Sequence, residues 1–410
     1  MTQASRVIVQ KYGGSSVANV DRIRHVAERV ARRRREGNRM VVVVSAMGDT
    51  TDDLISLARQ VTVHPRAREM DVLLSTGEMV SSSLLTMALH ELNEDAVSLT
   101  GLQAGIQTDS VYSKARIMNI DSQRLRDELD RGRTVVVAGF QGVTTDLDVT
   151  TLGRGGSDPS AVALAIALKA EQCERYTDVD GVYTTDPRIE PNARKLRDIG
   201  YEEMLELASH GAKIMHPRAV ELAQLYGLPI LVASSFSDEP GTLIHGGPAM
   251  EPINKVRGIA HDFDVAKITV RGVPDQPGIA AAMFGPLADS HISVDTIVQN
   301  SSLENLTDMT FTVMKGDLSH ALEIAEPLAA AIGATGIAAD SQLGKVSIVG
   351  TGMQNTPGYA ARMFRTLADS RINIELITTS EIRITCIIAE SDVLPAVRAL
   401  HRAFELESPE

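Results

Sequence analysis

The 410-residue sequence has little of the chemistry that marks several protein classes. It contains no tryptophan, and its two cysteines, Cys173 and Cys386, lie far apart with neither CxxC nor CxxH spacing. This usage predicts neither a zinc site nor a disulfide framework, and it favours a reducing compartment. The longest apolar runs, "MVVVV" and "AVALAIAL", are far shorter than a membrane span, and the N-terminus lacks an apolar signal core. We therefore expect a cytoplasmic protein with no membrane partner.

The chain also lacks an excess of positive charge. Its formal net charge is −13, which argues against a nucleic-acid partner. One basic run, Arg32 to Arg35, ends a helical pattern before Gly37, where cations complement the helix dipole. We therefore predict that this run is the solvated last turn of a helix rather than a contact for phosphate or nucleic acid.

Length and patterning predict more than one domain, since 410 residues are too many for one ordinary core. Up to about residue 240, amphipathic stretches such as "VDRIRHVAERVARR" and "PSAVALAIALKA" alternate with short runs rich in Val and Ile. These runs are "VIVQ", "MVVVVS", "AVSLT", "TVVVAGF", "RYTDVDGV" and "PILVAS". Buried strands that alternate with helices predict a mostly parallel sheet covered on both faces.

A segment dense in Gly and Pro, residues 237–255, precedes an internal repeat. Residues 277–297 reappear without a gap as 357–377, and the strand-like runs "AKITVRG" and "GKVSIVG" precede the two copies. A period of about eighty residues, each copy reading strand, Pro-Gly turn, helix and strand, indicates one small domain used twice. We predict a first domain over 1–245, a linker over 246–262, and repeat domains over 263–340 and 341–410.

Several nucleotide and metal motifs are absent or incomplete. No lysine is followed by Ser or Thr, which excludes a GxxxxGK[ST] loop. "GRGGSD" begins like GxGxxG, but aspartate stands where the third glycine belongs. "DVDG" lacks the other EF-hand ligands, and "HDFD" is not a DFG motif with its catalytic-loop partner.

The stretch "KYGGSS", Lys11 to Ser16, follows a strand-like run and precedes a helix-like one. Glycines let a backbone approach a ligand closely, and free N–H groups at a helix start favour an anion. Lys11 adds a point charge suited to a phosphoryl group. On its own, the glycine pair also fits a plain connection between a strand and a helix.

A second glycine-rich loop, "TLGRGGSD", precedes an apolar helix that Pro159 is predicted to begin. Asp158 fits the N-cap of this helix, a structural role that does not exclude a functional one. Arg154, which stands between glycines, is poorly explained by structure alone. We predict that it clamps a carboxylate with two hydrogen bonds.

Two further residues have a structural and a functional interpretation. Lys213 in "GAKIMHP" is either a solvated lysine or an ammonium for a buried anion, since its neighbours are small or apolar. Glu78 either completes a capping box that begins at Ser75 or binds the ammonium of a ligand. Spacing alone leaves these alternatives open.

The motifs "KYGGSS", "VVVVSAMGDTTD", "STGE", "VAGFQG", "TLGRGGSD", "YTDVDGVYTTDPR" and "GAKIMHP" resemble, in order and spacing, those of aspartokinases in the amino-acid kinase superfamily. The repeat is similar to the paired ACT regulatory domains of these enzymes, so the resemblance covers nearly the whole chain. It implies an α/β fold, a mostly parallel sheet sandwiched by helices, followed by two ferredoxin-like α+β ACT domains. It also implies that ATP with Mg²⁺ phosphorylates the β-carboxylate of L-aspartate to 4-phospho-L-aspartate, the entry to lysine, threonine, methionine and diaminopimelate biosynthesis.

The resemblance also implies roles for individual residues. A carboxylate acceptor is already ionised at neutral pH, so positioning and charge neutralisation are expected rather than a general base. No protein ligand for a metal is implied, so ATP would hold Mg²⁺. The implied residues are Lys11, Lys213 and Asp158 for catalysis; Ser45, Thr51, Glu78, Arg154, Gly155, Gly156 and Ser157 for aspartate; and Lys11, Tyr12, Gly13, Gly14, Ser15, Thr177, Asp178, Tyr183, Asp186, Arg188 and Lys213 for ATP.

For the tail, the resemblance implies effector sites for lysine, threonine or both where ACT domains pair between subunits of a homo-oligomer or an α2β2 assembly. Asn355 stands where the first copy has Asp275, and Glu375 stands where it has Asp295, so the copies are not expected to bind identically. Met250 lies where some relatives begin a separate regulatory subunit. The implied effector contacts are Asp275, Gly278, Ile279, Ala280, Gln299, Asp295, Asn373, Ile374, Ser380 and Glu381.

Two other functions deserve comparison with this one. A kinase of glutamate or acetylglutamate would share the glycine loop, but Glu78 and the double tail are not expected there. A catalytically silent ligand sensor would have lost Lys11, Asp158 or Lys213, and all three are present. A substrate panel separates the two kinases.

Overall fold

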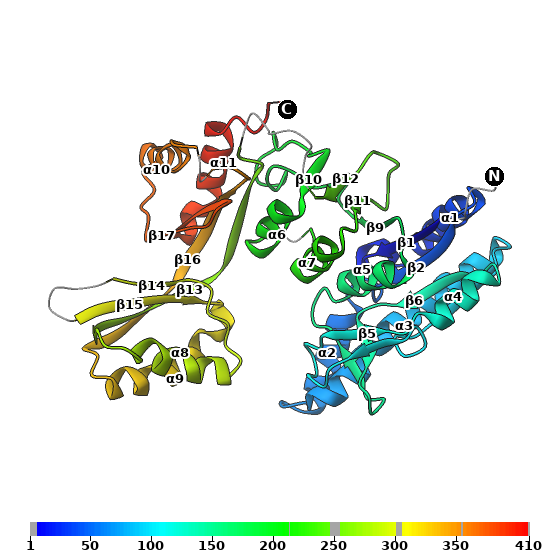
Figure 1. Cartoon of the computed structure of the whole chain (residues 1–410), viewed down its shortest axis with the longest axis horizontal. Helices are drawn as coiled ribbons and strands as arrows, with labels where there is room; N and C mark the ends of the chain where they lie inside the picture. Colours follow the sequence, from blue (N-terminus) through cyan, green and yellow to red (C-terminus); the bar gives the residue numbers. More distant parts are fainter. Residues whose placement is uncertain (1–5, 213, 247–254, 301–305, 354–355, 409–410) are drawn as a thin grey trace. The chain divides into compact units, whose positions relative to one another are not determined.

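The computed structural model describes residues 6–212, 214–246, 255–300, 306–353 and 356–408. The chain divides into two compact units. The first contains residues 1–183, 195–208 and 213–252, and the second contains residues 184–194, 209–212 and 253–410. In Figure 1 the first unit runs from blue to green, and most of the second runs from yellow-green to red.

An eight-stranded sheet in the order β10-β12-β11-β9-β1-β2-β6-β3 forms the centre of the first unit. All its neighbouring strands are parallel except β11 and β12, which confirms the predicted mostly parallel sheet. The run expected over 175–182 is a strand only as far as Thr177. The strands are β1 (Val7–Tyr12), β2 (Arg39–Val44), β3 (Ala96–Leu99), β6 (Thr134–Ala138), β9 (Gln172–Thr177), β10 (Asp198–Gly200), β11 (Ile230–Ser234) and β12 (Thr242–His245).

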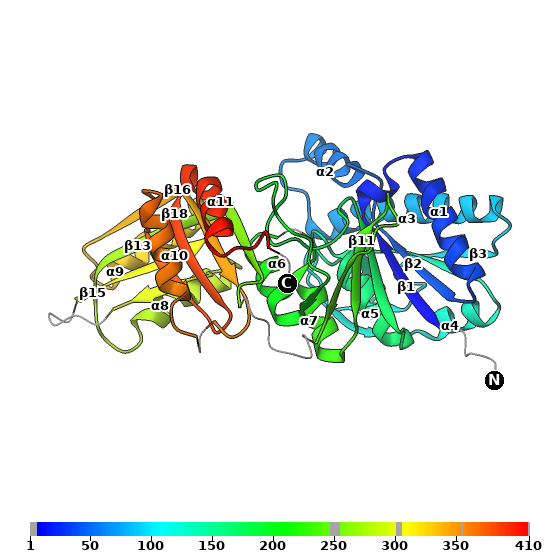
Figure 2. The ribbon, with the colours of Figure 1, turned by 90° about the horizontal axis from the view of Figure 1, so that it is seen from above.

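Helices cover both faces of this sheet, as Figure 2 shows. On one face, α1 (Val20–Arg35) and α3 (Ala67–Glu91) bury Val26, Val30 and Leu85 against Val42 of β2. On the other face, α5 (Ser157–Leu168) packs on β1, β2 and β9, and α4 (Gln123–Asp130) packs on β6. Successive residues of a strand point to opposite faces, so Lys11 of β1 faces α5.

The first unit has further elements that the sequence did not predict. A small sheet in the order β5-β4-β7-β8 consists of strands of only three or four residues. Such short strands carry almost no periodic signal. These elements are η1 (Gly14–Val17), α2 (Thr50–Val61), α6 (Tyr201–Ser209), α7 (Pro217–Tyr226), β4 (Ile106–Thr108), β5 (Ile117–Ile120), β7 (Gln141–Val143) and β8 (Val149–Thr151).

Two helix caps that the sequence allowed are absent from the structure. Ser75 and Glu78 lie inside α3, which begins at Ala67, and the Ser75 hydroxyl donates to the Val72 carbonyl at 2.8 Å, so they form no capping box. Helix α5 begins at Ser157 after Gly156, so Asp158 is not its N-cap and Pro159 is its third residue. Both interpretations arose because a cap motif also fits a helix interior.

Helix α3 is long and apolar enough to cross a membrane by length and composition. Half of its apolar window is buried inside the first unit, as in the core helix of a globular domain. Among the described residues no other helix meets both criteria.

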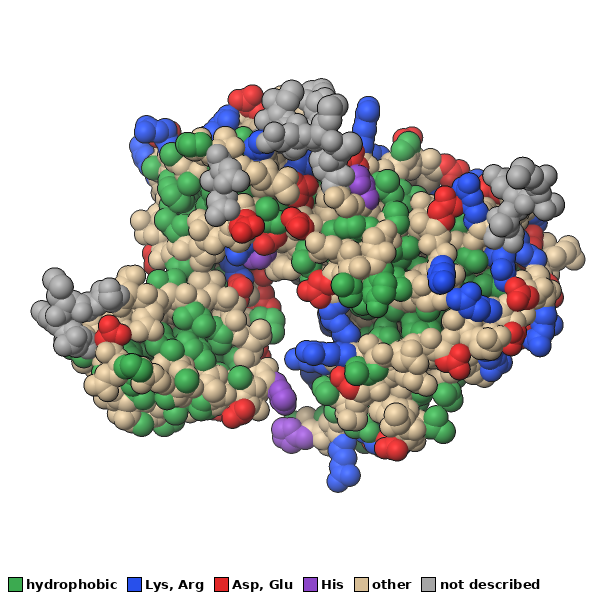
Figure 3. Space-filling view, viewed as in Figure 1, with side chains coloured by type: hydrophobic (Ala, Val, Ile, Leu, Met, Phe, Trp, Pro, Cys, Tyr) green, Lys and Arg blue, Asp and Glu red, His purple; other side chains and the backbone are tan. Residues whose placement is uncertain are grey.

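The basic run from Arg32 to Arg35 is the last turn of α1, as predicted. Arg33 pairs with Glu36 at 2.8 Å, and Arg35 pairs with Glu94 at 3.1 Å. Figure 3 shows Lys and Arg side chains interspersed with Asp and Glu on the visible face of the first unit. The run is therefore a paired, charged helix end.

The second unit contains a six-stranded antiparallel sheet in the order β14-β15-β13-β16-β18-β17. Both repeat copies follow the predicted order of strand, turn, helix and strand, and each continues with another strand and helix. The strands are β13 (Gly258–Pro274), β14 (Ile297–Gln299), β15 (Leu306–Val313), β16 (Gly336–Val349), β17 (Leu376–Thr379) and β18 (Arg383–Ala389). The helices are α8 (Ile279–Asp289), η2 (Lys315–Asp317), α9 (Leu318–Ala331), α10 (Tyr359–Asp369), η3 (Glu390–Asp392) and α11 (Val393–Ala403).

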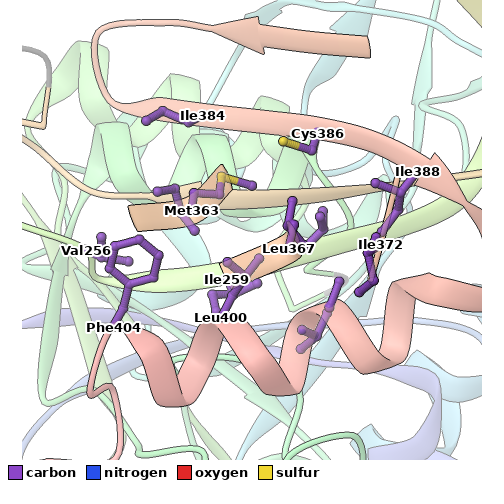
Figure 4. Close-up of a cluster of buried hydrophobic side chains, with 14 of the residues drawn as sticks. Val256, Ile259, Met363, Leu367, Ile372, Ile384, Cys386, Ile388, Leu400 and Phe404 are labelled. Atoms are coloured by element: carbon purple, nitrogen blue, oxygen red, sulfur yellow. The ribbon is translucent and has the colours of Figure 1, made fainter. Parts of the chain in front are cut away.

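The two copies share the long central strands β13 and β16. The start of β13 places Ile259 in one apolar core, with Leu367 of α10 and Leu400 of α11 (Figure 4). The end of β13 places Ile268 in a second core, with Met283 of α8. Residues 258–262, predicted as the end of the linker 246–262, therefore belong to a strand.

Two ion pairs cross between the copies. Lys267 Nζ lies 2.9 Å from Glu375 Oε2, and Lys345 pairs with Asp295. The lysines are the second residues of the two strand-like runs, and the acids are equivalent positions of the repeat. Each lysine thus takes its partner from the other copy, as expected for two similar halves related by an approximate twofold axis.

Candidate active site

The glycine loop after β1 allows two backbone segments to pack closely. A Cβ atom on Gly14 would lie 2.9 Å from the Ala46 carbonyl oxygen and 3.2 Å from that of Gly48. The Gly48 N–H donates to the Gly14 carbonyl at 3.1 Å. Among the described residues, a Cβ on Gly13 would meet only Lys11 Nζ at 3.8 Å and the Tyr176 carbonyl oxygen at 4.0 Å. Packing therefore requires glycine at position 14, whereas position 13 is open and beside the lysine ammonium.

Three charged side chains meet beside this loop on the α5 face of the sheet. Lys11 Nζ lies 2.7 Å from Asp158 Oδ1, and Arg175 Nε donates to Asp158 Oδ2 at 3.1 Å. The side chains of Lys11, Asp158 and Arg175 are 7%, 5% and 12% exposed. The backbone N–H of His216 also donates to Asp158 Oδ2, at 3.3 Å. Asp158 is thus shared between two cations.

The charges in this cluster shift one another's pKa values. Burial opposes ionisation of Asp158, but Arg175 and Lys11 hold the pKa of its carboxyl well below the usual range. Burial lowers the pKa of the Lys11 ammonium, Asp158 counteracts this, and Arg175 adds to it. Asp158 therefore acts only as a hydrogen-bond acceptor at neutral pH.

A chain of contacts connects this cluster to Glu78. Ser45 Oγ donates to Ser157 Oγ at 3.0 Å, and the next N–H along the chain, that of Ala46, donates to Glu78 Oε1 at 3.0 Å. Glu78 Oε2 is buried and has no hydrogen-bond partner among the described residues. Burial raises the pKa of Glu78 to about 7. One oxygen of Glu78 therefore fixes the 45–49 loop, and the other remains available to a ligand.

Arg154 stands at the rim of the same region. Its side chain is 89% exposed, and Nη2 lies 3.3 Å from Asp52 Oδ1, one residue after Thr51 in α2. This contact is a weak surface ion pair, and the clamp on a ligand carboxylate stays a prediction. A Cβ on Gly155, whose φ is +77°, would lie 2.9 Å from His216 Cδ2, so glycine is required between Arg154 and the helix.

Gly156 is confined as well, since a Cβ there would lie 2.7 Å from Leu152 Cβ. The Ser15 carbonyl accepts a hydrogen bond from Arg22 at 2.5 Å.

The side chain of Tyr12 is fully buried on the face of the sheet opposite to Lys11, where its ring stacks on that of Tyr176 with the ring centroids 5.0 Å apart. The predicted contact of Tyr12 with ATP could therefore come only from its backbone.

The predicted nucleoside-side residues fall into two groups. In the first unit, Thr177 Oγ1 donates to Asp178 Oδ1 at 3.0 Å, and the Tyr183 hydroxyl donates to an Asp180 oxygen at 2.8 Å. Asp186 and Arg188 belong to the second unit. Lys213 lies outside the described residues.

The predicted effector residues all belong to the second unit and form local groups. Asp275 and Gly278 lie in the turn from β13 into α8, where Gly278 has φ +97°, and Ile279 and Ala280 begin α8. Gln299 ends the edge strand β14, and Asp295 pairs with Lys345. In the second copy, Asn373 Nδ2 donates to Glu375 Oε1 at 3.2 Å, and Ile374 lies between these two residues in the sequence. The Ser380 N–H donates to the Arg383 carbonyl at 2.8 Å, which closes a turn that contains Glu381. Asn355 and Met250 lie outside the described residues.

Sequence reasoning missed Arg175 and the backbone of His216. Arg175 pairs in register with Lys11 across the parallel strands β9 and β1, so the two side chains share a face. An arginine in a strand expected to be buried was a signal of a functional role. That Lys11 is its neighbour could not be known before the order of the strands was known. Among the described residues no group of three or more His, Cys, Asp or Glu side chains could hold a metal ion.

Comparison with known proteins shows matches along the chain. Residues 6–234 match the amino acid kinase family, and residues 268–330 and 346–404 match ACT domains. An aspartokinase of Pseudomonas aeruginosa is 52% identical over 405 residues, covering 98% of both chains. One of Corynebacterium glutamicum is 51% identical, covering 98% of this chain and 96% of that one.

Solved structures agree. E. coli aspartokinase III in complex with aspartate and ADP has a TM-score of 0.84 and 25% identity, covering 97% of this chain and 99% of that one. The same enzyme with lysine and aspartate has a TM-score of 0.74. Aspartate kinase from Synechocystis is 47% identical with a TM-score of 0.54, covering 97% of this chain and 69% of that one. The chain therefore belongs to the aspartokinases of the amino acid kinase family, is an enzyme that phosphorylates aspartate, and carries ACT domains of the regulatory kind.

Proposed function

We propose that the chain transfers the γ-phosphoryl group of MgATP to the β-carboxylate of L-aspartate, giving 4-phospho-L-aspartate, at the site of Lys11 and Asp158. The observation that carries this proposal is the pair itself. Two buried groups of opposite charge, 2.7 Å apart, lie beside a glycine that leaves room for a ligand. Kinases of this kind need positioned cations more than a base, because the acceptor carboxylate is already ionised.

In this proposal Lys11, the open position at Gly13 and the N–H group of Gly14 hold the phosphates, because the Gly13 N–H already donates to the Tyr176 carbonyl at 3.3 Å. Asp158 orients the Lys11 ammonium. Lys213 adds a second lysine on the transferred group. The donors available do not form a metal cage, since Asp158 is already shared by two cations. Mg²⁺ then enters with ATP as part of the substrate, with phosphate oxygens and water as its ligands.

The acceptor side of the site follows from the same contacts. The available oxygen of Glu78 suits the ammonium of aspartate, and Arg154 suits a carboxylate once it leaves Asp52. Ser45, Thr51, Gly155, Gly156 and Ser157 line the aspartate pocket. Tyr12, Ser15, Thr177, Asp178, Tyr183, Asp186 and Arg188 are assigned to ATP.

The ACT unit is proposed to bind lysine, threonine or both and to inhibit the kinase by feedback. The E. coli relative was solved with lysine, which supports an amino-acid effector. Binding between ACT domains of paired subunits, in a homo-oligomer or an α2β2 assembly, would use the effector residues named above. We assign the enzyme to the cytoplasm and to the entry of lysine, threonine, methionine and diaminopimelate biosynthesis, and we propose the domains 1–245, 263–340 and 341–410.

The test is acyl-phosphate formation from MgATP and L-aspartate, trapped with hydroxylamine, alone and with lysine, threonine or both. Inhibition by either or both supports the regulatory proposal, and inhibition only by the pair identifies a concerted sensor. Gln299→Ala or Asp275→Ala should then relieve inhibition at unchanged uninhibited activity. Activity insensitive to all three mixtures contradicts the effector proposal, and activity with glutamate but not aspartate contradicts the acceptor.

A further inference from the structure

Arg175 occupies a position in the fold that is unfavourable unless it serves the site. It lies directly opposite Lys11 on the neighbouring parallel strand, so two cations share one face of the sheet at adjacent positions. Both side chains are nearly buried, where repulsion between like charges is weakly screened. A strand position that served only the fold would favour an apolar residue.

Asp158 compensates only part of this charge. It contacts Lys11 through Oδ1 and Arg175 through Oδ2, so the cluster holds two cations and one anion. The N-terminus of α5, where Asp158 is the second residue, adds a further partial positive charge. Lys11, Arg175 and Asp158 are therefore left with a surplus of positive charge in a place with little water, which the Glu78 carboxylate offsets in part as it ionises near its pKa of about 7.

A second observation points to a ligand. Arg175 Nη1 is buried and has no hydrogen-bond partner among the described residues. A guanidinium nitrogen without a partner is costly in a folded protein and is satisfied when an anionic oxygen binds. Since Lys11 Nζ lies beside Gly13, an anion attracted by the cluster arrives next to the open glycine position.

We propose that Arg175 is a positioning residue of the phosphoryl-transfer site, which fixes Asp158 against Lys11 and supplies the surplus positive charge that draws in the nucleotide phosphates. This inference rests on the proposed role of Lys11 and Asp158. Arg175 adds a third cation to Lys11 and Lys213, which the sequence motifs implied. It also gives Asp158 a second ion-pair partner besides Lys11.

The groups that face Asp158 decide its charge. Among the described residues, Asp158 is faced by Lys11 from β1, by Arg175 and Cys173 from β9, and by His216 at the start of α7. Burial raises the pKa of the Cys173 thiol and lowers the pKa of His216, so both are neutral near pH 7. Among the described charged side chains, Arg175 and Lys11 keep Asp158 ionised, and the His216 N–H adds a hydrogen bond to it.

The test compares the wild-type enzyme with Arg175→Met, Arg175→Lys and a matched control, Arg33→Met. Arg33 pairs with Glu174, the strand neighbour of Arg175, at 2.6 Å on the opposite face of β9. The readouts are kcat with MgATP and aspartate, the equilibrium Kd for MgADP by calorimetry, and the melting temperature.

We expect Arg175→Met to lower kcat by about tenfold or more and to weaken MgADP binding by about tenfold. Arg175→Lys should recover most of these losses, because the charge is restored. Arg33→Met should keep kcat and Kd within about twofold while lowering the melting temperature.

An Arg175→Met enzyme with wild-type kcat and MgADP affinity would overturn the proposal, and so would an Arg175→Lys enzyme that recovers neither. So would equal losses in Arg33→Met, which would reduce Arg175 to a structural role. If the wild-type enzyme formed no aspartyl phosphate, the proposed function would fail. The MgADP affinities, which need no acceptor, would still decide the role of Arg175.

Discussion

The ammonium of Lys11 lies 2.7 Å from a carboxylate oxygen of Asp158, and neither side chain is more than 7% exposed. Breaking a buried ion pair by removing one partner leaves an uncompensated charge, which costs far more than losing a surface pair. Here the loss would strand two cations, because Asp158 also accepts from Arg175. The pair therefore couples the stability of the first unit to its chemistry.

Asp158→Asn keeps the size of the side chain and removes its charge. We expect the free energy of unfolding to fall by about 3–5 kcal/mol and kcat to fall at least about tenfold. Denaturant unfolding and steady-state kinetics measure the two effects. Glu171→Gln is the matched control, because its pair with Arg6 at 3.1 Å is more than half exposed and should contribute less than about 1 kcal/mol. Equal effects in both variants would contradict the account.

The two glycines of the loop should respond differently to alanine. Gly14→Ala should lower the melting temperature, because its Cβ would come within 2.9 Å of the Ala46 carbonyl oxygen. Gly13→Ala should leave the melting temperature within about 2 °C, because its nearest neighbours are at 3.8 and 4.0 Å. It should instead raise the KM for ATP, since a methyl group would occupy the space left for phosphate. Thermal unfolding measures the effect on stability, and steady-state kinetics measure the KM for ATP. An unchanged KM for ATP in Gly13→Ala would mean that the phosphates do not bind beside Gly13.

Glu78 predicts how aspartate binding depends on pH. Burial raises its pKa to about 7, so the carboxylate that would meet the substrate ammonium is mostly protonated at pH 6 and mostly ionised at pH 8. We expect the KM for aspartate to fall by about tenfold over this range. Glu78→Gln should remove that dependence and raise the KM at pH 8. A KM that is flat with pH in the wild type would contradict the role.

The same shift has a consequence for stability. The ordinary pKa of the residue is 4.5, so between 4.5 and about 7 the folded state holds a proton that the unfolded state releases. The free energy of unfolding should therefore fall as pH rises through this window. Glu78→Gln should be less destabilised relative to the wild type at pH 8 than at pH 5. Denaturant unfolding at the two pH values provides the check, and the opposite order would contradict the raised pKa.

The crossed ion pairs of the second unit should contribute unequally. Lys345 is 9% exposed and Lys267 is 18% exposed, and their partners are 46% and 37% exposed. We expect Lys345→Met to destabilise the second unit by about 1–3 kcal/mol and Lys267→Met by less than about 1 kcal/mol. Denaturant unfolding of each variant, monitored in the second unit, measures the two losses of stability. Equal costs would mean that the two pairs are equivalent despite their different burial.

The sequence was sufficient where a pattern is local or repeated. Alternating Val-rich strands predicted the parallel sheet, and the duplicated segment predicted two similar α/β halves. The shared strands β13 and β16 could not be predicted, because a strand that serves two cores shows no break in its pattern. The linker was therefore extended into residues 258–262, which form the start of β13.

The site shows the same limit. Lys11 and Asp158 stand next to glycines in recognisable loops, so local motifs led to both. Arg175 lies within a strand, and its role depends on which strand is its neighbour, which only the fold reveals. The helix caps that the sequence allowed at Ser75 with Glu78 and at Asp158 are absent for the related reason that a short polar motif does not fix where a helix begins.

The most direct test of the central claim is the rate of hydroxamate-trapped aspartyl phosphate formation by the wild-type enzyme and by Lys11→Met, both assayed at a temperature where circular dichroism shows them to be folded. If Lys11 and Asp158 form the phosphoryl-transfer site, the wild type forms the product from MgATP and L-aspartate. Lys11→Met then forms it at less than about one hundredth of that rate. A Lys11→Met enzyme that keeps near wild-type turnover would contradict the account.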